Sequence, residues 1–282
     1  MQYAQLSSLR KKVLEEAAKL VPKYGFRDAG LVSYALEATK ENEFSRDVGT
    51  LGDADFARMF PRGFPIALVE HIVVNSNNVT HRRLEECFNK AATLESVAKN
   101  SELYRTGQYK PPGVKNVVEE AMLTKFNCLM PYVKHWPEAV ALEWNPVNVP
   151  FAIKNMAEFV DTTCYYAERM ENLGAVIASG NVLLQSRLHC FDPNDSLNSK
   201  PNRGCHAAFK TDEERFWHSF SAAIPLSNGP HTREGSLSYE WYAKRTKVAA
   251  VLSLGMLSFI GEESCHHPET KAMLKCITDK LL

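Results

Sequence analysis

Cysteine and histidine side chains that could bind a metal lie in the second half of the 282-residue chain. His189-Cys190 and Cys205-His206 form two mirrored pairs, separated by a stretch rich in turn-forming residues. Zinc accepts such ligands, and a metal-dependent enzyme is therefore one possible function, but the Cys-x-x-Cys spacing of common structural zinc sites is missing. We therefore predict no metal site and interpret the four as loop residues.

Other spacings that carry catalysis are incomplete. A carboxylate-bridged di-iron bundle requires two Glu-x-x-His pairs and two further glutamates, whereas the chain offers one pair, Glu263 to His266. The sequence contains no GxGxxG, GxxxxGK[ST], GxSxG or HExxH motif. Cys265-His266-His267 precedes Pro268 and fits a turn and helix cap better than a ligand set. We expect no catalytic residue and no cofactor.

Large, flexible apolar side chains are more numerous in the second half than a small core requires. Methionine suits pockets that adapt to irregular ligands, so these side chains are candidates for lining a cavity that binds a long apolar molecule. Ordinary core packing is the alternative. The candidate lining residues are Met122, Phe126, Met130, Met156, Phe159, Val160, Leu252 and Met256, with Phe259 beside them.

Helical periodicity positions these residues and predicts an all-α protein. Hydrophobic residues make up 45% of the chain and charged residues 23%, which is typical of a globular protein. Val248–Ile260 is the longest apolar run, and it is shorter than the roughly 20 residues of a membrane-spanning helix. Seven cysteines, an odd number, argue against a disulfide framework.

Proline and glycine divide the chain into helices. Gly25 is expected to end the first helix, and Pro131 to kink a helix that Trp136 ends before Pro137 begins the next. A break at Pro111–Gly113 is the predicted boundary between subdomains 1–110 and 111–282, and residues 179–236 are interpreted as a partly ordered insertion. The predicted helices are Leu6–Tyr24, Arg27–Thr39, Asp53–Met59, a helix from Pro65, Met122–Val133, Pro137–Trp144, Phe151–Met170, Ser238–Glu263 and His267–Leu282.

Three short helices followed by a long connector form the plan of a helix-turn-helix protein, so a DNA-binding regulator is a competing function. DNA affinity depends on neutralisation of phosphates by Lys and Arg. Residues 42–63 are slightly acidic instead, with Asp53 and Asp55 in the third helix against Arg58. We therefore expect no nucleic-acid partner.

Five segments, in order, resemble a family of mitochondrial ubiquinone (coenzyme Q) biosynthesis accessory proteins, the ninth of the Coq proteins. The resemblance covers residues 10–170 and 236–282 and does not extend to the insertion. The segments are AAKLVPKYGF, MPYVKHWPEAVAL, NPVNVP, VDTTCYYAER and EWYAKRTKVAAV.

That resemblance implies a TetR-repressor-like helical bundle with a degenerate N-terminal helix-turn-helix. It implies a non-catalytic protein whose ligand is an isoprenoid or phospholipid, and which presents a ubiquinone precursor to a late-pathway di-iron hydroxylase. It implies peripheral attachment at the matrix face of the mitochondrial inner membrane. The family's partner-binding Trp-Tyr pair matches Trp241 and Tyr242, with Arg245 one turn on. From the residues alone, the aromatic pair suits an exposed hot spot or a contact covered by the insertion.

Two further expectations concern association. Family members carry an amphipathic helix, which lies on the membrane, after the last bundle helix. The sequence up to Leu282 contains no such helix. Phe216, Trp217 and Phe220 of the insertion are therefore an alternative membrane contact. TetR relatives dimerise through their last two helices, which predicts a homodimer through Lys244–Ile260 and Pro268–Leu282.

Overall fold

The computed structural model describes residues 3–27, 30–41, 53–89, 112–189, 239–262 and 267–282, with positions 96, 99, 100, 103, 108, 110 and 264 between them. Every element in these ranges is a helix, which confirms the all-α class. The TetR-repressor-like detail stays a prediction, as does the division of the chain at residue 110.

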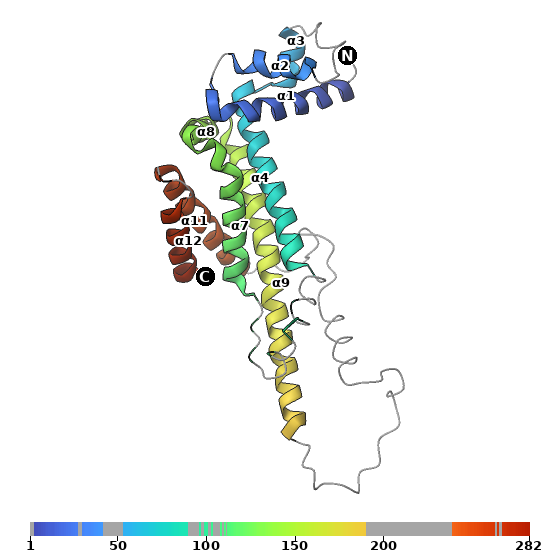
Figure 1. Ribbon diagram of the computed structural model, residues 1–282, viewed down its shortest axis with the longest axis vertical. Helices are drawn as coiled ribbons and strands as arrows, with labels where there is room; N and C mark the ends of the chain where they lie inside the picture. Colours follow the sequence, from blue (N-terminus) through green and yellow to red (C-terminus); the bar gives the residue numbers. More distant parts are fainter. Residues whose placement is uncertain are drawn as a thin grey trace.

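Three N-terminal helices lie across one end of a helical stem (Figure 1): α1 (Tyr3–Tyr24), α2 (Leu31–Glu41) and α3 (Asp53–Met59). Side chains three and four residues apart share one helix face, and this spacing predicts an apolar stripe along α1. Its members Leu9, Val13 and Ala17 are buried, and Leu6, Leu20 and Tyr24 are partly buried. As predicted, α1 ends at Gly25, whose φ of 77° is accessible to glycine at little cost.

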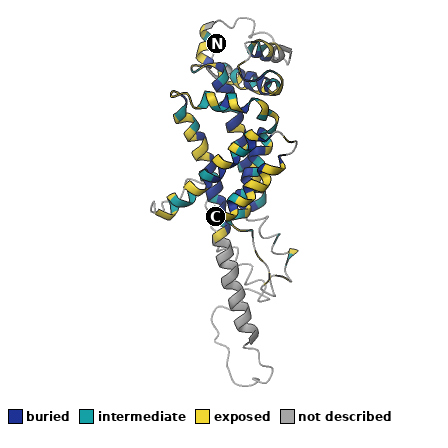
Figure 2. Cartoon of the chain, turned by 90° about the vertical axis from the view of Figure 1, so that its left-hand side faces the viewer, coloured by how far each residue is buried: buried dark blue, intermediate teal, exposed yellow. Residues whose placement is uncertain are grey.

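The stem is built from α4 (Phe64–Phe88), α7 (Val114–Leu129) and α9 (Val149–His189), which run side by side (Figure 1). A helical pair, α11 (Tyr239–Gly261) and α12 (Pro268–Leu281), packs against α7, and α11 also contacts α9. Apolar side chains from α1 through α12 form one core cluster, and the buried residues, dark blue in Figure 2, follow the length of the bundle.

The chain turns a corner after α7. Pro131 cannot donate to the helical hydrogen-bond ladder, and the predicted kink takes the form of a 3₁₀ helix, η2 (Met130–His135). Helix α8 (Trp136–Glu143) follows with Pro137 in its first turn. Trp136 caps the end of η2, in agreement with the prediction that a helix ends there, but it also begins α8 with helical φ and ψ angles of −63° and −32°. The steric bias against a helical residue before proline, on which the prediction rested, is overridden at this corner.

This corner anchors the N-terminal helices. The backbone N–H of Phe26 donates to Glu138 Oε2 at 3.1 Å, and His135 Nδ1 lies 3.5 Å from Glu138 Oε1. The Phe26 ring packs edge-on against Trp136, with ring centroids 6.2 Å apart. The residues after Gly25 are thus held to η2 and α8 by both polar and aromatic contacts.

A second corner joins α11 to α12. Glu262 accepts hydrogen bonds from the backbone N–H groups of Glu269 (2.9 Å) and Thr270 (2.8 Å) and from the Ser264 hydroxyl. Although burial opposes the charged form, these hydrogen bonds lower the pKa of Glu262 to about 2. The carboxylate therefore caps the first turn of α12, whose N–H groups lack intrahelical acceptors.

Two sequence expectations differ from the fold. Helix α9 continues to His189, whereas the insertion was expected to begin at Ser179; Val182, Leu183 and Leu184 suit a helix and no proline interrupts it. The rest of the expected insertion, including its aromatic cluster, lies outside the described residues. The second concerns α12, where the sequence pattern predicts that Met273, Leu274, Ile277 and Leu281 face inward. Met273 is instead 39% exposed, because Thr270, Leu274 and Thr278 form the buried face.

Helix α11 contains the apolar run noted in the sequence, and its buried face includes Val248, Val251 and Phe259. Within the described part of the chain, no helix combines the length and apolar character that a bilayer crossing requires.

Candidate functional site

A cavity of about 370 Å³ lies between α7, α8, α9 and α11, with one contact from α4. Its walls are mostly apolar, with a few polar groups, which is the usual composition of a small-molecule site. The residues that line it are Val73, Lys125, Trp136, Val140, Glu143, Trp144, Val149, Ala152, Ile153, Asn155, Met156, Leu252, Ser253, Met256, Leu257 and Ile260.

Three of the eight predicted lining residues meet at this cavity: Met156 from α9, and Leu252 and Met256 from α11. The other five lie in or against the core away from its walls: Met122, Phe126, Phe159 and Val160 are buried, and Met130 is partly buried. The ring of Phe126 instead stacks on Phe259, with centroids 5.2 Å apart.

Sequence reasoning missed the wall that α8 contributes. Trp136, Val140, Glu143 and Trp144 occupy positions that are four, three and one apart along this short helix and its end. Lys125 was also missed, although a lysine inside the apolar stripe of α7 was a usable signal, because lysine is rarely buried without a partner.

Lys125 is 5% exposed and belongs to a hydrogen-bond network between α7, α4 and α9. Its ammonium donates to Ser76 Oγ at 3.1 Å and to Asn77 Oδ1 at 2.6 Å. Asn77 Nδ2 in turn donates to the carbonyl oxygen of Asn155 at 2.9 Å. Burial lowers the pKa of Lys125 to about 8, against the opposing influence of Glu143.

Glu143 is the second ionisable group in the cavity wall, at the end of α8. Burial raises the pKa of this carboxyl to about 7, the charge of Lys125 opposes the rise and that of Glu70 adds to it. Glu70 is itself paired with Arg62, at 2.6 Å between Oε2 and Nη2. Ionisable side chains with perturbed pKa values in the wall of one cavity, here Lys125 and Glu143, are typical of functional sites.

The rim of the cavity exposes large apolar side chains to solvent. Trp144 is 73% exposed, Leu257 68% and Ile153 55%, and all three line the cavity. Phe151 and Val147 are also exposed, between the end of α8 and the first turn of α9. Exposed apolar side chains that gather around an opening indicate a site for an apolar ligand or surface.

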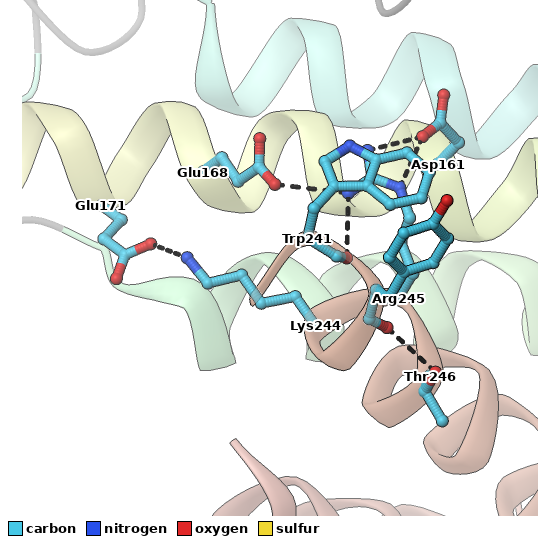
Figure 3. Close-up of polar contacts among 8 residues, drawn as sticks. Asp161, Glu168, Glu171, Trp241, Lys244, Arg245 and Thr246 are labelled. Carbon is cyan, nitrogen blue, oxygen red and sulfur yellow. Dashed lines mark hydrogen bonds and ion pairs between the residues drawn. The ribbon is translucent and has the colours of Figure 1, made fainter. Parts of the chain in front are cut away.

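The predicted partner-binding residues lie in the first turns of α11 (Figure 3). Arg245 faces α9: its Nε and Nη2 donate to Asp161 Oδ1 at 2.8 and 2.6 Å, and its Nη1 lies 3.4 Å from Glu168 Oε1. The guanidinium also stacks on Trp241, at 3.6 Å from the ring centroid. Tyr242 packs edge-on against Trp241 and is half exposed.

These contacts assign different roles to Arg245 and Tyr242. Arg245 holds α11 on α9, so its charge is committed within the chain. Tyr242 offers its ring to solvent and remains available as a docking residue. Neighbouring Lys244 adds an ion pair to Glu171 on α9.

The structure describes few of the residues on which the metal-site and DNA-binding alternatives depend. Cys190, Cys205 and His206 lie outside the described ranges, and the described residues contain no group of three or more potential metal ligands. In α3, Asp55 lies 4.0 Å from Arg58, so an acidic side chain neighbours the basic one there.

Comparison with known proteins supplies the family context. No protein-family model matches the chain. It is 24% identical over 165 residues to the human "Ubiquinone biosynthesis protein COQ9, mitochondrial", which covers 58% of this chain and 44% of the human protein. It is 26% identical over 171 residues to the Drosophila melanogaster protein of that name (58% and 41%), and 24% identical over 165 residues to COQ9-A of Xenopus laevis (58% and 44%).

The match thus spans less than half the length of these curated relatives. The shared name across a mammal, an insect and an amphibian agrees with the family resemblance seen in the sequence. The chain is a homologue of the COQ9 ubiquinone biosynthesis proteins.

Proposed function

We propose that the chain is a non-catalytic lipid-binding protein of ubiquinone biosynthesis, and that it binds an isoprenoid precursor in the cavity between α7, α8, α9 and α11. The observation that carries this proposal is the apolar cavity with its exposed apolar rim. The relatives, named as ubiquinone biosynthesis proteins, supply the pathway.

The size of the cavity indicates how such a ligand would sit. Its volume of about 370 Å³ is near the lower end of small-molecule sites, which run from roughly 300 to 1,000 Å³. A long polyprenyl tail exceeds this space, so the cavity holds one end of the ligand and the tail leaves over Trp144, Ile153 and Leu257. Covering the tail matters, because each CH₂-sized group withdrawn from water contributes about 0.8 kcal/mol.

Delivery requires a partner and a membrane. We propose that the chain acts in the mitochondrion, at the matrix face of the inner membrane, and presents its ligand to a di-iron hydroxylase. Tyr242 is the favoured docking residue, because its ring is half exposed whereas Arg245 is engaged with α9. A homodimer through α11 and α12 is proposed as well, and exposed Leu254 and Met273 provide apolar side chains on that pair.

The test is to fill the cavity and measure bound lipid. Ala152 lines the cavity from α9, and replacing it with tryptophan adds a large side chain where the wall is small. Ala157 lies on the same helix, is exposed and does not line the cavity, so Ala157→Trp is the matched control.

Mass spectrometry of lipids extracted from the purified protein should find isoprenoid lipid with the parent chain and with Ala157→Trp. The lipid content of folded Ala152→Trp should fall severalfold. Equal lipid content in all three proteins would exclude this cavity as the site. Aspartate at Phe126 or Phe159 is a weaker test, because both rings are buried in the core.

A further inference from the structure

We propose that Lys125 and Glu143 form a polar subsite inside this cavity that receives an uncharged ring bearing hydroxyl or carbonyl oxygens, and that disfavours an anionic diphosphate. The inference rests on the proposed lipid-binding function and specifies which end of the ligand enters the cavity and which groups recognise it.

Geometry places the two groups in the wall of the same cavity. Lys125 comes from α7 on the buried side, and Glu143 comes from the end of α8. Leu257 and Ile153 lie at the exposed rim. A ligand with a polar head and an apolar tail therefore fits with its head inward and its tail outward.

Lys125 has hydrogen-bonding capacity to spare. An ammonium carries three N–H donors. Among the described residues, Ser76 and Asn77 accept two of them, and the face of the Phe159 ring lies 4.7 Å from the nitrogen. The remaining donor can serve a carbonyl or hydroxyl oxygen of a ligand, which gains strength from the positive charge.

Glu143 can complement that donor. Within the described part of the chain, its carboxyl makes no hydrogen bond or ion pair, although Lys125 acts on it through its charge. Because its pKa is about 7, the carboxyl is available near neutral pH both as an acceptor for a ring hydroxyl and, when protonated, as a donor to a ring oxygen.

The charge around the cavity selects against anions. One ammonium, Lys125, and one carboxyl, Glu143, line it, and the nearby Glu70 on α4 is already paired with Arg62, whose charge is therefore committed. A diphosphate brings several negative charges into a partly desolvated space and meets one cation beside a carboxylate, which is unfavourable. An uncharged ring meets no such penalty, and Trp136 and Trp144 provide aromatic surfaces in the same walls.

The experiment compares the affinities of ligands that share one apolar tail and differ in the head group. The probes are a benzoquinone with a two-isoprene tail, the diphosphate of the same tail and the tail hydrocarbon without a head. Equilibrium dialysis and mass spectrometry of bound probe give dissociation constants for the parent chain, Lys125→Met and Glu143→Gln. Circular dichroism checks that each variant is folded, and Glu143→Gln decides the matter if Lys125→Met does not fold.

The parent should bind the quinone about tenfold more tightly than the diphosphate. Lys125→Met should lose about tenfold in quinone affinity and keep its hydrocarbon affinity, since one charged hydrogen bond is removed. Glu143→Gln should bind the diphosphate about fivefold more tightly than the parent, because a carboxylate no longer opposes the anion.

Two results would overturn the proposed subsite. The first is equal affinity of the parent for the quinone and the diphosphate. The second is a folded variant whose affinities for the quinone, the diphosphate and the hydrocarbon all change by the same factor. Both leave the lipid-binding function standing. Failure of the parent to bind any of the three probes would instead overturn the proposed function itself.

Discussion

Glu143 shows how a single residue of the cavity wall couples the site to pH. Its pKa in the folded protein is about 7, above the ordinary 4.5. Between those two pH values the folded protein retains a proton that the unfolded chain has released. The stability this proton contributes is complete below about pH 4.5 and is lost as the pH rises through 7.

The parent should therefore lose stability between about pH 5 and about pH 7.5, whereas Glu143→Gln, which has no titrating carboxyl at this position, should not. The free energy of unfolding of Glu143→Gln relative to the parent should rise over this range by about 1–3 kcal/mol after allowance for solvent screening. Lys125 on α7 and Glu70 on α4 are the charged groups that act on this carboxyl. Urea unfolding across that pH range measures the effect. Glu158→Gln, on the exposed face of α9, is the control, and a pH-independent difference for Glu143→Gln would contradict the prediction.

Substitutions of Arg245 and Tyr242 should lower the free energy of unfolding by different amounts. Arg245→Met leaves Asp161 and Glu168 partly buried without their cation, which should lower the free energy of unfolding by about 2–4 kcal/mol. Tyr242→Ala removes a half-exposed ring and should change it by less than about 0.5 kcal/mol. Chemical denaturation measures both.

The same pair bears on partner binding. If Tyr242 docks the hydroxylase, Tyr242→Ala should weaken the complex while the free chain keeps its stability. A complex unaffected by Tyr242→Ala would remove this ring from the docking surface. Loss of binding with Arg245→Met alone would be explained by displacement of α11.

At the scale of the elements, α11 approaches α7 closely because Gly255 has no side chain. A Cβ built there would lie 2.9 Å from Cζ and 3.2 Å from Cε2 of Phe126, whose ring stacks on Phe259. Gly255→Ala should therefore cost about 1–3 kcal/mol of stability, because the added Cβ would push the Phe126 ring out of its stack on Phe259. Thermal or urea unfolding measures the change.

The last residue of α11 provides the control. A Cβ at Gly261 would meet nothing within 4 Å, so Gly261→Ala should be neutral or stabilise the helix by up to about 1 kcal/mol. Combining Gly255→Ala with Phe126→Leu, which narrows the facing side chain, should recover part of the loss. Equal effects of alanine at both glycines would refute the close contact.

Gly25 plays a related part between α1 and the corner of η2 and α8. Its φ is 77°, and a Cβ there would lie 3.0 Å from His135 Nδ1 and 3.2 Å from Glu138 Oε2. Gly25→Ala should cost about 1–3 kcal/mol, from backbone strain and from displacement of the carboxylate that accepts the Phe26 N–H. Urea unfolding tests this, and unchanged stability would show that the corner adjusts freely.

For the whole molecule, ligand binding and stability are linked. A ligand that binds only the folded chain, at a free concentration about 100 times its dissociation constant, increases the free energy of unfolding by about 2.7 kcal/mol. Such an increase raises the melting temperature by several degrees. The short-tailed quinone should have this effect on the parent and on Ala157→Trp, and little effect on folded Ala152→Trp, whose cavity is filled. Differential scanning calorimetry checks it, and equal shifts in all three would place the ligand elsewhere.

Many helix boundaries of this protein were predictable from local sequence patterns. The stripe on α1, the stop at Gly25, the seven residues of α3 and the extent of α12 follow from helical periodicity and from the backbone limits of proline and glycine. These are short-range effects, which neighbouring residues specify by themselves. The family resemblance likewise depended on contiguous segments, and the comparisons agree with it.

The sequence by itself therefore determined the all-α class and most helix boundaries, and its eight candidate lining residues included Met156, Leu252 and Met256, which lie in the cavity wall. The tertiary structure alone decided that Phe126 and Phe159 fill the core, that α8 closes the cavity and that Lys125 and Glu143 share it. Periodicity identifies the apolar face of a helix but not what that face meets. Whether two such faces close against each other or leave a space depends on how distant helices cross, and in this bundle α8, which follows α7 through η2, forms one wall of the space.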